Sequence, residues 1–275
     1  MRARPFMQVD VFTGTPYFGN PVGVVLDATG VDDDEMQRVA AWANLSETTF
    51  VFPPTTAAAD YRVRIFTTAN ELPFAGHPTL GTAHAWLAHS GDNKEALTQQ
   101  CAAGLVRVRK GKGGLAFAAP PMVRSGPVEE ALVDRLARSL NVDRADVVDA
   151  QWVDNGPGWV ALMLKDASSV LALRPGPVEG PVGVVGAYPP GDGPAYEVRA
   201  FLPNDGGTTE DPVTGSLNAS LAEWLTSTGR FEPPYVASQG AARGRKGLAY
   251  IEQDEDGTIW VGGGTVTCIE GHVRI

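Results

Sequence analysis

The feature that most constrains this 275-residue chain is a motif that occurs twice. Residues 73–87 and 209–221 each contain a titratable residue, a proline, a glycine and a small hydroxylated residue at the same spacing. Aligned without gaps, the equivalent pairs are His77 and Asp211, Pro78 and Pro212, Gly81 and Gly215, and Thr82 and Ser216. The segments that lead into the two copies, residues 63–66 and 198–201, share Val, Arg and Phe at the same places. This repeat predicts a duplicated domain.

Each copy of the motif predicts a short strand, a loop and then a helix. Proline is favoured at the first position of a helix, because the N–H that it lacks would have no partner there. Pro78 and Pro212 therefore predict that His77 and Asp211 are the N-cap residues of two related helices. A helix N-terminus offers free N–H groups and the positive end of the helix dipole. We expect the two helix starts to face each other and to form a pocket for an anion.

The length and the composition of the chain predict two β-rich domains. A chain of 275 residues exceeds the usual size of a single domain. The 43% of apolar residues suffices for hydrophobic cores, and the 32 glycines and 21 prolines indicate many turns. The best boundary is the segment 119–121, an alanine followed by two prolines. The predicted domains are residues 1–118 and 119–275, and the last strand can cross back to the first domain.

Charge and cysteine content narrow the choice of partners and compartment. The formal net charge of −10 argues against a nucleic-acid partner, which would require a basic surface. Cys101 and Cys268 lie far apart and match no metal-binding or disulfide pattern, which favours a reducing compartment. No apolar run is long enough to span a membrane, and the N-terminal residues lack the apolar core of a signal peptide. We expect a cytoplasmic protein without a nucleic-acid or membrane partner.

In the first half of the chain, the apolar pattern predicts strands around one buried helix. Strands are expected at residues 6–12, 22–26 and 61–66, and in the second half of the segment 44–52, with Glu47 at the start of that strand. The helix that runs from Pro78 to about His89 is apolar on nearly all of its faces. Such a helix is buried on all sides. We therefore expect it to pass through a curved sheet or barrel.

The second half repeats this plan. An amphipathic helix is expected at residues 127–140, and the central helix of this half ends near Gly229. Strands are expected at residues 147–153, 158–164, 181–187, 247–252, 258–262 and 265–269.

Glu47, His77 and Asp211 are the candidate catalytic residues. An acid/base enzyme needs a group that takes and returns a proton near neutral pH, and a glutamate in a partly apolar site suits this task. Each residue also has a structural explanation: Glu47 as an exposed carboxylate at a strand start, His77 as a cap or packed side chain, and Asp211 as an N-cap. The repeat favours catalysis, because equivalent helix starts would bring His77 and Asp211 to one domain cleft, where ligand sites are common.

Gly76, Gly215 and Ser216 are the candidate substrate-binding residues. Backbone N–H groups at a helix start can hold a carboxylate or an oxyanion. The structural alternative is that both glycines only permit tight turns. The glycine-rich segment 239–245 lacks the spacing of a phosphate-binding loop, and no metal-binding spacing is present. We therefore expect no cofactor and no metal, and we expect His84 to be a core residue.

Taken together, several motifs resemble the PhzF family of phenazine-biosynthesis isomerases and their relatives. They occur in order along the whole chain, at residues 9–12, 19–21, 47–50, 71–81, 210–216, 239–240 and 261–264. The resemblance implies the diaminopimelate-epimerase fold. This is an α+β architecture of two similar domains, each a β-barrel-like sheet wrapped around a central helix, with the active site between them.

The same resemblance implies a role for each candidate. Glu47 would take a proton from carbon and return it, while His77 and Asp211 would assist proton transfer and hold the substrate. The three candidate binding residues would bind the substrate carboxylate. The predicted function is a cofactor-independent isomerase that moves a proton, and with it a double bond, on a small cyclic or unsaturated carboxylic acid, similar to trans-2,3-dihydro-3-hydroxyanthranilate isomerase. A homodimer is also implied.

Two other functions remain open from the sequence. Amino-acid epimerases of this fold place a cysteine at each helix start, and Cys101 and Cys268 occupy neither place, which disfavours a two-thiol racemase. A racemase that uses Glu47 with His77 or Asp211 is still compatible with the sequence. The third function is a non-catalytic metabolite-binding protein, and the intact set of acid/base residues argues against it.

Overall fold

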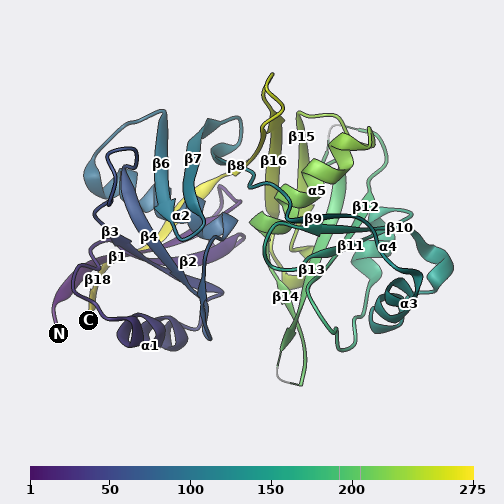
Figure 1. Ribbon diagram of the computed structural model, residues 1–275, viewed down its shortest axis with the longest axis horizontal. Helices are drawn as coiled ribbons and strands as arrows, with labels where there is room; N and C mark the ends of the chain where they lie inside the picture. The colour runs from purple at the N-terminus through teal and green to yellow at the C-terminus, as the bar shows by residue number, and fades with distance from the viewer. Residues whose placement is uncertain (192, 205) are drawn as a thin grey trace. The chain divides into compact units, whose positions relative to one another are not determined.

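The computed structural model describes residues 1–275 except 192 and 205, and the chain forms two compact units (Figure 1). Unit 1 consists of Met1–Ala118 and Gly262–Ile275, and unit 2 of Ala119–Val261. The chain thus leaves unit 1 once and returns to it with its final strand. In the part of the chain that is described, no helix has the length and apolar character needed to cross a membrane.

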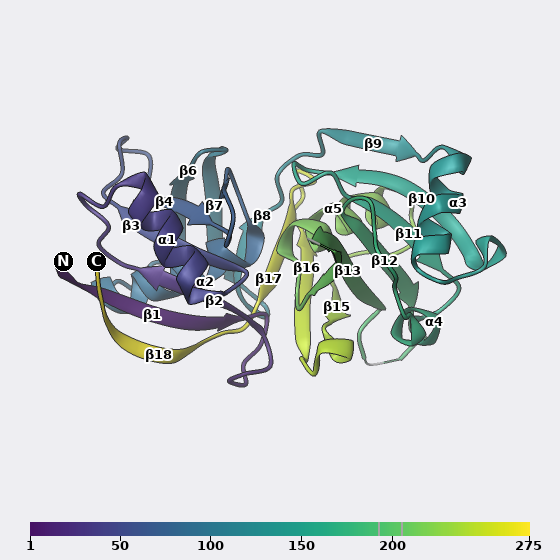
Figure 2. The ribbon, with the colours of Figure 1, turned by 90° about the horizontal axis from the view of Figure 1, so that it is seen from below.

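Unit 1 builds a curved sheet around one helix. Its helices are α1 (Asp33–Ala43) and α2 (Gly76–Ser90). Its strands are β1 (Ala3–Val11), β2 (Asn20–Val25), β3 (Glu47–Phe52), β4 (Tyr61–Phe66), β5 (Glu71–Leu72), β6 (Ala96–Cys101), β7 (Gly104–Gly111), β8 (Gly114–Ala118) and β18 (Thr265–Arg274). The first and last strands of the chain, β1 and β18, run side by side in antiparallel pairing (Figure 2). From β1 the pairing continues through β2, β3, β4, β6, β7 and β8.

Helix α2 is the centre of unit 1. Strands β1, β2, β3, β8 and β18 all contact it, and its residues from Gly76 to Ala83 are buried. Gly81 lets the helix approach the sheet closely, because a Cβ atom there would lie only 2.3 Å from Cγ1 of Val22. The expected helix inside a curved sheet is therefore confirmed.

Unit 2 has the same components. Its helices are α3 (Glu130–Ser139), α4 (Ala167–Ala172) and α5 (Gly215–Ser227). Its strands are β9 (Arg124–Pro127), β10 (Val147–Asp154), β11 (Val160–Leu164), β12 (Val182–Ala187), β13 (Tyr196–Asn204), β14 (Gly207–Asp211), β15 (Tyr235–Gln239), β16 (Gly247–Gln253) and β17 (Ile259–Gly263), which leads back to unit 1. Helix α5 is buried along most of its length, whereas α3 and α4 cover an apolar cluster on the strands.

The two units share one order of strand pairing, and this confirms the duplicated α+β fold. In unit 1, β1 pairs antiparallel with β2, β2 parallel with β3, β3 antiparallel with β4, and β4 parallel with β6. In unit 2, β10, β11, β12, β13 and β15 repeat these four relations in the same order. The helices α2 and α5 occupy corresponding positions in this scheme.

The first central helix begins two residues earlier than the proline predicts. Ala75 is the N-cap of α2, so that His77 and Pro78 are its second and third residues. The prediction that His77 is an N-cap is therefore wrong. Proline is tolerated throughout the first turn, since the N–H groups of that turn have no partner within the helix.

The second central helix begins later than predicted. Thr214 is the N-cap of α5, and Asp211 is the last residue of β14. The prediction that Asp211 is an N-cap is wrong, because Pro212 lies in the loop before the helix rather than in its first turn.

A repeated ion pair shows how the two units correspond. Arg64 on β4 donates hydrogen bonds of 2.7 and 2.6 Å to the two carboxylate oxygens of Glu71 on β5. Arg199 on β13 donates hydrogen bonds of 2.9 and 2.8 Å to Glu210 on β14 in the same way. Arg64 and Arg199 are 135 positions apart, whereas Glu71 and Glu210 are 139 positions apart. The β13–β14 hairpin is therefore four residues longer than the β4–β5 hairpin.

This longer hairpin overturns the gapless alignment of the two motifs. Beyond it, the residue of unit 2 that corresponds to His77 is Ser216, the second residue of α5. Asp211 corresponds instead to Leu72, which ends β5 as Asp211 ends β14. His77 and Asp211 are therefore not equivalent positions of the duplication.

The other predicted elements are largely confirmed. The helix expected at residues 127–140 is α3, which begins later because Arg124–Pro127 form strand β9. The strand expected at residues 265–269 continues to Arg274 as β18. Its extension follows from its pairing with the whole length of β1.

The duplicated ion pair allows a matched test of burial. The side chains of Arg199 and Glu210 are 5% and 11% exposed, whereas those of Arg64 and Glu71 are 24% and 34% exposed. We expect Glu210→Gln to lower the free energy of unfolding by about 3 kcal/mol, because it leaves a buried guanidinium without its counter-charge. We expect the control Glu71→Gln to lower it by less than about 1 kcal/mol. Urea denaturation followed by tryptophan fluorescence measures both values, and equal losses would contradict the role given to burial.

Candidate active site

Glu47 lies at the start of a strand, as the sequence indicates. It is the first residue of β3 and pairs with Val22 of the parallel strand β2. The preceding helix α1 ends at Asn44, whose left-handed backbone (φ 54°) turns the chain toward β3. The side chain of Glu47 is 15% exposed. This carboxylate is thus largely covered and does not project from an outer surface.

The fold of unit 1 brings His77 next to Glu47. Nε2 of His77 lies 3.3 Å from Oε2 of Glu47. On the other side of the ring, Nδ1 lies 3.3 Å from Nδ2 of Asn20. The imidazole comes from the first turn of α2, the carboxylate from β3 and the amide from β2. Three elements that are distant in sequence therefore build one buried polar cluster.

The imidazole of His77 is neutral at pH 7. Burial lowers its pKa to about 3, because a charged ring loses its hydration there, and a hydrogen bond to the backbone of Pro21 offsets this effect only in part. The 3.3 Å contact with Glu47 is longer than a charge-assisted hydrogen bond, which agrees with a neutral ring. His77 therefore carries a single proton on one of its two nitrogens.

Asp211 belongs to unit 2, where it is attached to the start of α5. It pairs with Ala200 of β13. Its Oδ2 accepts a hydrogen bond of 2.6 Å from Oγ1 of Thr214, the N-cap residue. The carboxylate is thus tied to the cap rather than acting as the cap itself.

Gln239, the last residue of β15, fixes the loop that carries Asp211. Its Oε1 accepts hydrogen bonds from the N–H of Thr214 at 3.0 Å and from Nδ2 of Asn218 at 2.8 Å. Its Nε2 donates to the carbonyl of Asp211 at 3.1 Å and to Oγ1 of Thr214 at 2.9 Å. Every hydrogen-bonding position of this buried amide is therefore used.

Ser216 is held at the start of α5 by two side chains of the same unit. Its Oγ accepts a hydrogen bond of 3.1 Å from Nε1 of Trp159, and its carbonyl accepts one of 3.0 Å from Nδ2 of Asn155. An indole N–H can only donate, so that the hydroxyl proton of Ser216 is left to donate to another acceptor.

The candidate binding residues all lie in the first turns of the two central helices. Gly76 is the first residue of α2, and Gly215 and Ser216 are the first two residues of α5. Their N–H groups have no partner four residues earlier within the helix and lie at the positive end of the helix dipole. This arrangement suits the oxygens of a carboxylate.

The structure therefore brings the sequence candidates together in two groups. Glu47, His77 and Gly76 are neighbours in unit 1. Asp211, Gly215 and Ser216 surround the start of α5 in unit 2.

Sequence reasoning gave no individual role to Asn20, Gln239 or Trp159. Asn20 stands between a glycine and a proline, and Gln239 precedes a glycine, so that each is a polar residue beside a turn signal. These neighbouring turn residues could have marked Asn20 and Gln239 as buried residues that hydrogen-bond other parts of the chain. Trp159 carries no such signal, because its contact with Ser216 depends on the tertiary fold.

The remaining histidine and cysteine candidates lie elsewhere. His84 is half-buried, and its two ring nitrogens lie 2.8 Å from Oγ1 of Thr267 and 2.9 Å from Oγ1 of Thr265. It joins α2 to β18 and is thus not a purely apolar core residue. Cys101 lies in β6 and Cys268 in β18, so that neither is a residue of a helix start. Within the described residues, no group of three or more His, Cys, Asp or Glu side chains is arranged to hold a metal ion.

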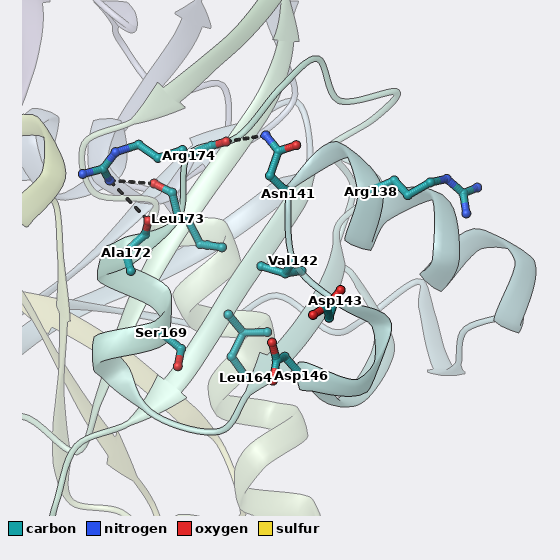
Figure 3. A pocket seen from close by; sticks show the side chains of 10 residues that line it. All are labelled: Arg138, Asn141, Val142, Asp143, Asp146, Leu164, Ser169, Ala172, Leu173 and Arg174. Carbon is teal, nitrogen blue, oxygen red and sulfur yellow. Dashed lines mark hydrogen bonds between the residues drawn. The ribbon is translucent and has the colours of Figure 1, made fainter.

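A separate hollow lies on the surface of unit 2 (Figure 3). Its volume is about 650 Å³, and it lies between the end of α3 and helix α4. Arg138 and Arg174 extend away from the other lining side chains, on opposite sides in the view of Figure 3. The guanidinium of Arg174 donates to the carbonyls of Ala172 and Leu173. This hollow holds none of the candidate residues.

With this geometry established, comparison with known proteins identifies the family. Residues 9–271 match the family described as phenazine biosynthesis-like protein, PhzC-PhzF. The chain belongs to the PhzF family. It is 32% identical to antisense-enhancing sequence 1 of Schizosaccharomyces pombe, over 98% of this chain and 99% of the relative. It is 36% identical to the trans-2,3-dihydro-3-hydroxyanthranilate isomerase of Pseudomonas chlororaphis, over 62% of this chain and 60% of that enzyme. A further relative, 30% identical over 93% of this chain and 89% of the relative, is an uncharacterised isomerase of Pasteurella multocida.

Solved structures agree with the fold. The PhzF-family protein of Bacillus anthracis has a TM-score of 0.82 at 24% identity, and each chain is covered completely. A hydroxyproline epimerase from Agrobacterium vitis has a TM-score of 0.60 at 12% identity, over 99% of this chain and 92% of the epimerase. The diaminopimelate-epimerase-like fold is therefore confirmed. Together with the isomerase relatives, family membership makes the chain an isomerase-type enzyme.

The network around Gln239 leads to a test that needs no substrate. We expect Gln239→Leu to lower the free energy of unfolding by about 2 kcal/mol, because it leaves the N–H of Thr214 and the carbonyl of Asp211 without their buried partner. The control is Gln253→Leu, which removes an exposed amide with one hydrogen bond of 3.3 Å. Urea denaturation compares the two variants. A loss no larger than that of the control would show that Gln239 does not fix the loop.

Proposed function

We propose that this PhzF-family protein is a cofactor-independent isomerase that moves a proton, and with it a double bond, on a small cyclic or unsaturated carboxylic acid. The observation that carries the proposal is the buried contact of 3.3 Å between Glu47 and His77 at the start of α2. A carboxylate beside a neutral imidazole, in a largely covered place, has the composition of a general acid/base site.

In this reaction Glu47 is the proton carrier. Its carboxylate takes a proton from a carbon of the substrate, the electron pair of that C–H bond shifts the neighbouring double bond, and Glu47 returns the proton to another carbon. The net change is a shift of one hydrogen and one double bond, so that no oxidant or reductant is required. A carboxylate that is only 15% exposed is shielded from exchange with bulk water during this cycle.

The other candidate residues hold the substrate and assist the transfer. In this proposal His77 and Asp211 hydrogen-bond polar groups of the substrate, and the N–H groups of Gly76, Gly215 and Ser216 bind its carboxylate. The hydroxyl of Ser216, whose oxygen already accepts from Trp159, adds one further donor.

The relatives suggest where the search for the substrate begins. The Pseudomonas enzymes that share 36% identity with this chain are named for trans-2,3-dihydro-3-hydroxyanthranilate, a cyclic amino acid with double bonds in its ring. We propose a substrate of this class. A two-thiol racemase is disfavoured, because Cys101 and Cys268 lie in β6 and β18 rather than at the helix starts.

The test of this function is Glu47→Gln. We expect the variant to lose more than tenfold of the rate at which the wild type exchanges a carbon-bound hydrogen of trans-2,3-dihydro-3-hydroxyanthranilate with deuterium, because an amide cannot take the proton. Proton NMR in deuterated buffer measures the exchange.

The control is Glu71→Gln, which removes a carboxylate that is bound to Arg64. We expect this variant to keep the wild-type rate. Exchange by Glu47→Gln within tenfold of the wild type would show that Glu47 is not the proton carrier. Exchange only at the α-carbon of amino acids would indicate a racemase, and tight binding without any exchange would indicate a metabolite-binding protein.

A further inference from the structure

The peptide bond that opens each central helix carries a second hydrogen bond on its carbonyl. In α2 the carbonyl of Ala75 accepts from the N–H of Thr79 at 3.2 Å and from the hydroxyl of Thr79 at 2.9 Å. In α5 the carbonyl of Thr214 accepts from the N–H of Asn218 at 3.0 Å and from Nδ2 of Asn218 at 2.9 Å. The backbone N–H alone gives each carbonyl its helical partner, so that the bond from the side chain is an additional one.

The N–H groups of these same two peptide bonds belong to Gly76 and Gly215, the first residues of α2 and α5. We propose that Thr79 and Asn218 are positioning residues that hold and polarise these two N–H groups for the carboxylate of the substrate. The proposal rests on the proposed function, in which Gly76 and Gly215 bind that carboxylate. Both side chains act through the peptide bond and not by contact with the substrate.

The geometry of a peptide bond connects its two ends. The unit is planar, and its C=O and N–H groups point in opposite directions within that plane. A donor that fixes the carbonyl therefore also fixes the direction of the N–H on the other side. Linked hydrogen bonds polarise one another, so that a carbonyl with two donors makes its N–H a stronger donor. Gly76 and Gly215 are buried, which limits competition from water for these N–H groups.

Buried side chains fix the direction of the additional bond in unit 1. The hydroxyl of Tyr61 donates to Oε1 of Gln99 at 3.2 Å, and Nε2 of Gln99 donates to Oγ1 of Thr79 at 2.9 Å. An amide nitrogen only donates, so that the hydroxyl proton of Thr79 is left for the carbonyl of Ala75. Tyr61, Gln99 and Thr79 are all buried, and the hydroxyl therefore has one stable orientation.

Gln239 fixes the additional bond in unit 2. Its Nε2 donates to the carbonyl of Asp211, so that its Oε1 is the acceptor that faces Nδ2 of Asn218. The Nδ2 group thus gives one hydrogen to Gln239 and the other to the carbonyl of Thr214. Oδ1 of Asn218 is buried and has no hydrogen-bond partner within the part of the chain that the structure describes. This side chain therefore serves as a donor and not as an acceptor.

The two units build the additional bond from different residues. Its donor is the fourth residue of the helix in both, but this residue is a threonine in α2 and an asparagine in α5. The supporting glutamines do not correspond in position. Gln99 pairs with Tyr61, whereas Tyr196, the counterpart of Tyr61, pairs with Ala237, which lies two residues before Gln239. Duplication alone does not preserve a bond whose donor and support have both changed, and this favours a requirement at the helix start.

The first test needs no substrate and uses ¹⁵N NMR of the full-length protein labelled at glycine. Thr79→Val keeps the shape of the side chain without its hydroxyl. We expect it to move the amide ¹⁵N signal of Gly76 to lower frequency, because the preceding carbonyl loses a donor, and we expect Thr79→Ser to restore the signal. The variant Gly76→Ala assigns it.

The control is Thr82→Val, which removes another buried hydroxyl of α2, one that donates to Oγ1 of Thr49. It should leave the signal of Gly76 unchanged. An unchanged signal in Thr79→Val would overturn the proposal.

The second test measures the binding of a carboxylate, with anthranilate as the probe and isothermal titration calorimetry as the measurement. We expect Thr79→Val and Asn218→Leu each to weaken binding about fivefold, because each leaves one N–H a poorer partner for a charged group. Thr79→Ser should restore the affinity, and Thr82→Val should keep it. An equal loss in Thr82→Val, or a wild type that does not bind anthranilate, would overturn the proposal.

Kinetics separate positioning from a merely structural role. A bond to the unreacting carboxylate is as strong in the ground state as in the transition state, so that weakening it raises KM and spares kcat. For exchange of trans-2,3-dihydro-3-hydroxyanthranilate we expect Thr79→Val to raise KM about fivefold and to keep kcat within about twofold. A lower kcat at unchanged KM would overturn the proposal. If Glu47→Gln leaves exchange intact while Thr79→Val weakens anthranilate binding, the proposed function fails and this inference stands.

Discussion

Helices α2 and α5 are buried along most of their length, and this burial decides which polar groups each unit must contain. A polar side chain that such a helix carries into the core needs a hydrogen-bond partner there, because water cannot supply one. Thr79 donates its hydroxyl to the carbonyl of the N-cap residue of α2, and Asn218 donates its amide to the corresponding carbonyl of α5, each at 2.9 Å. Gln99 and Gln239 in turn hydrogen-bond these two side chains. Since each unmatched buried group costs about 1–3 kcal/mol, these partners are a condition of the fold.

The need for buried hydrogen-bond partners is common to both units, but the side chains at the starts of their central helices differ. The second residue of each central helix is contacted by a buried or half-buried asparagine, but it is His77 in one unit and Ser216 in the other. Likewise, the strand that precedes each helix ends in Leu72 in unit 1 and in Asp211 in unit 2. The polar framework is thus duplicated, whereas the side chains that it presents have diverged. An isomerase that treats two faces or two atoms of a substrate differently requires this kind of asymmetry.

Much of the fold could be predicted, because its strongest determinant is visible in the sequence. A helix without a polar face has to be enclosed, and the repeat shows that this happens twice. The register of the duplication could not be predicted, because a hairpin that is four residues longer leaves no trace in an alignment without gaps. The contact between Glu47 and His77 followed from the resemblance to a family and not from spacing, since 30 residues separate them. The parts played by Asn20 and Gln239 depend on tertiary contacts that no local pattern specifies.

The corrected register changes the argument for the candidate site. From the sequence, the equivalence of His77 and Asp211 was the main reason to treat either as catalytic, and the structure removes that equivalence. A direct observation takes its place, since the carboxylate of Glu47 lies 3.3 Å from a neutral, buried imidazole. Two groups in such a contact share an environment in which water is scarce and electrostatic interactions are strong. The carboxylate and the imidazole therefore have to be considered together, because a change in the charge of one alters the energy of the other.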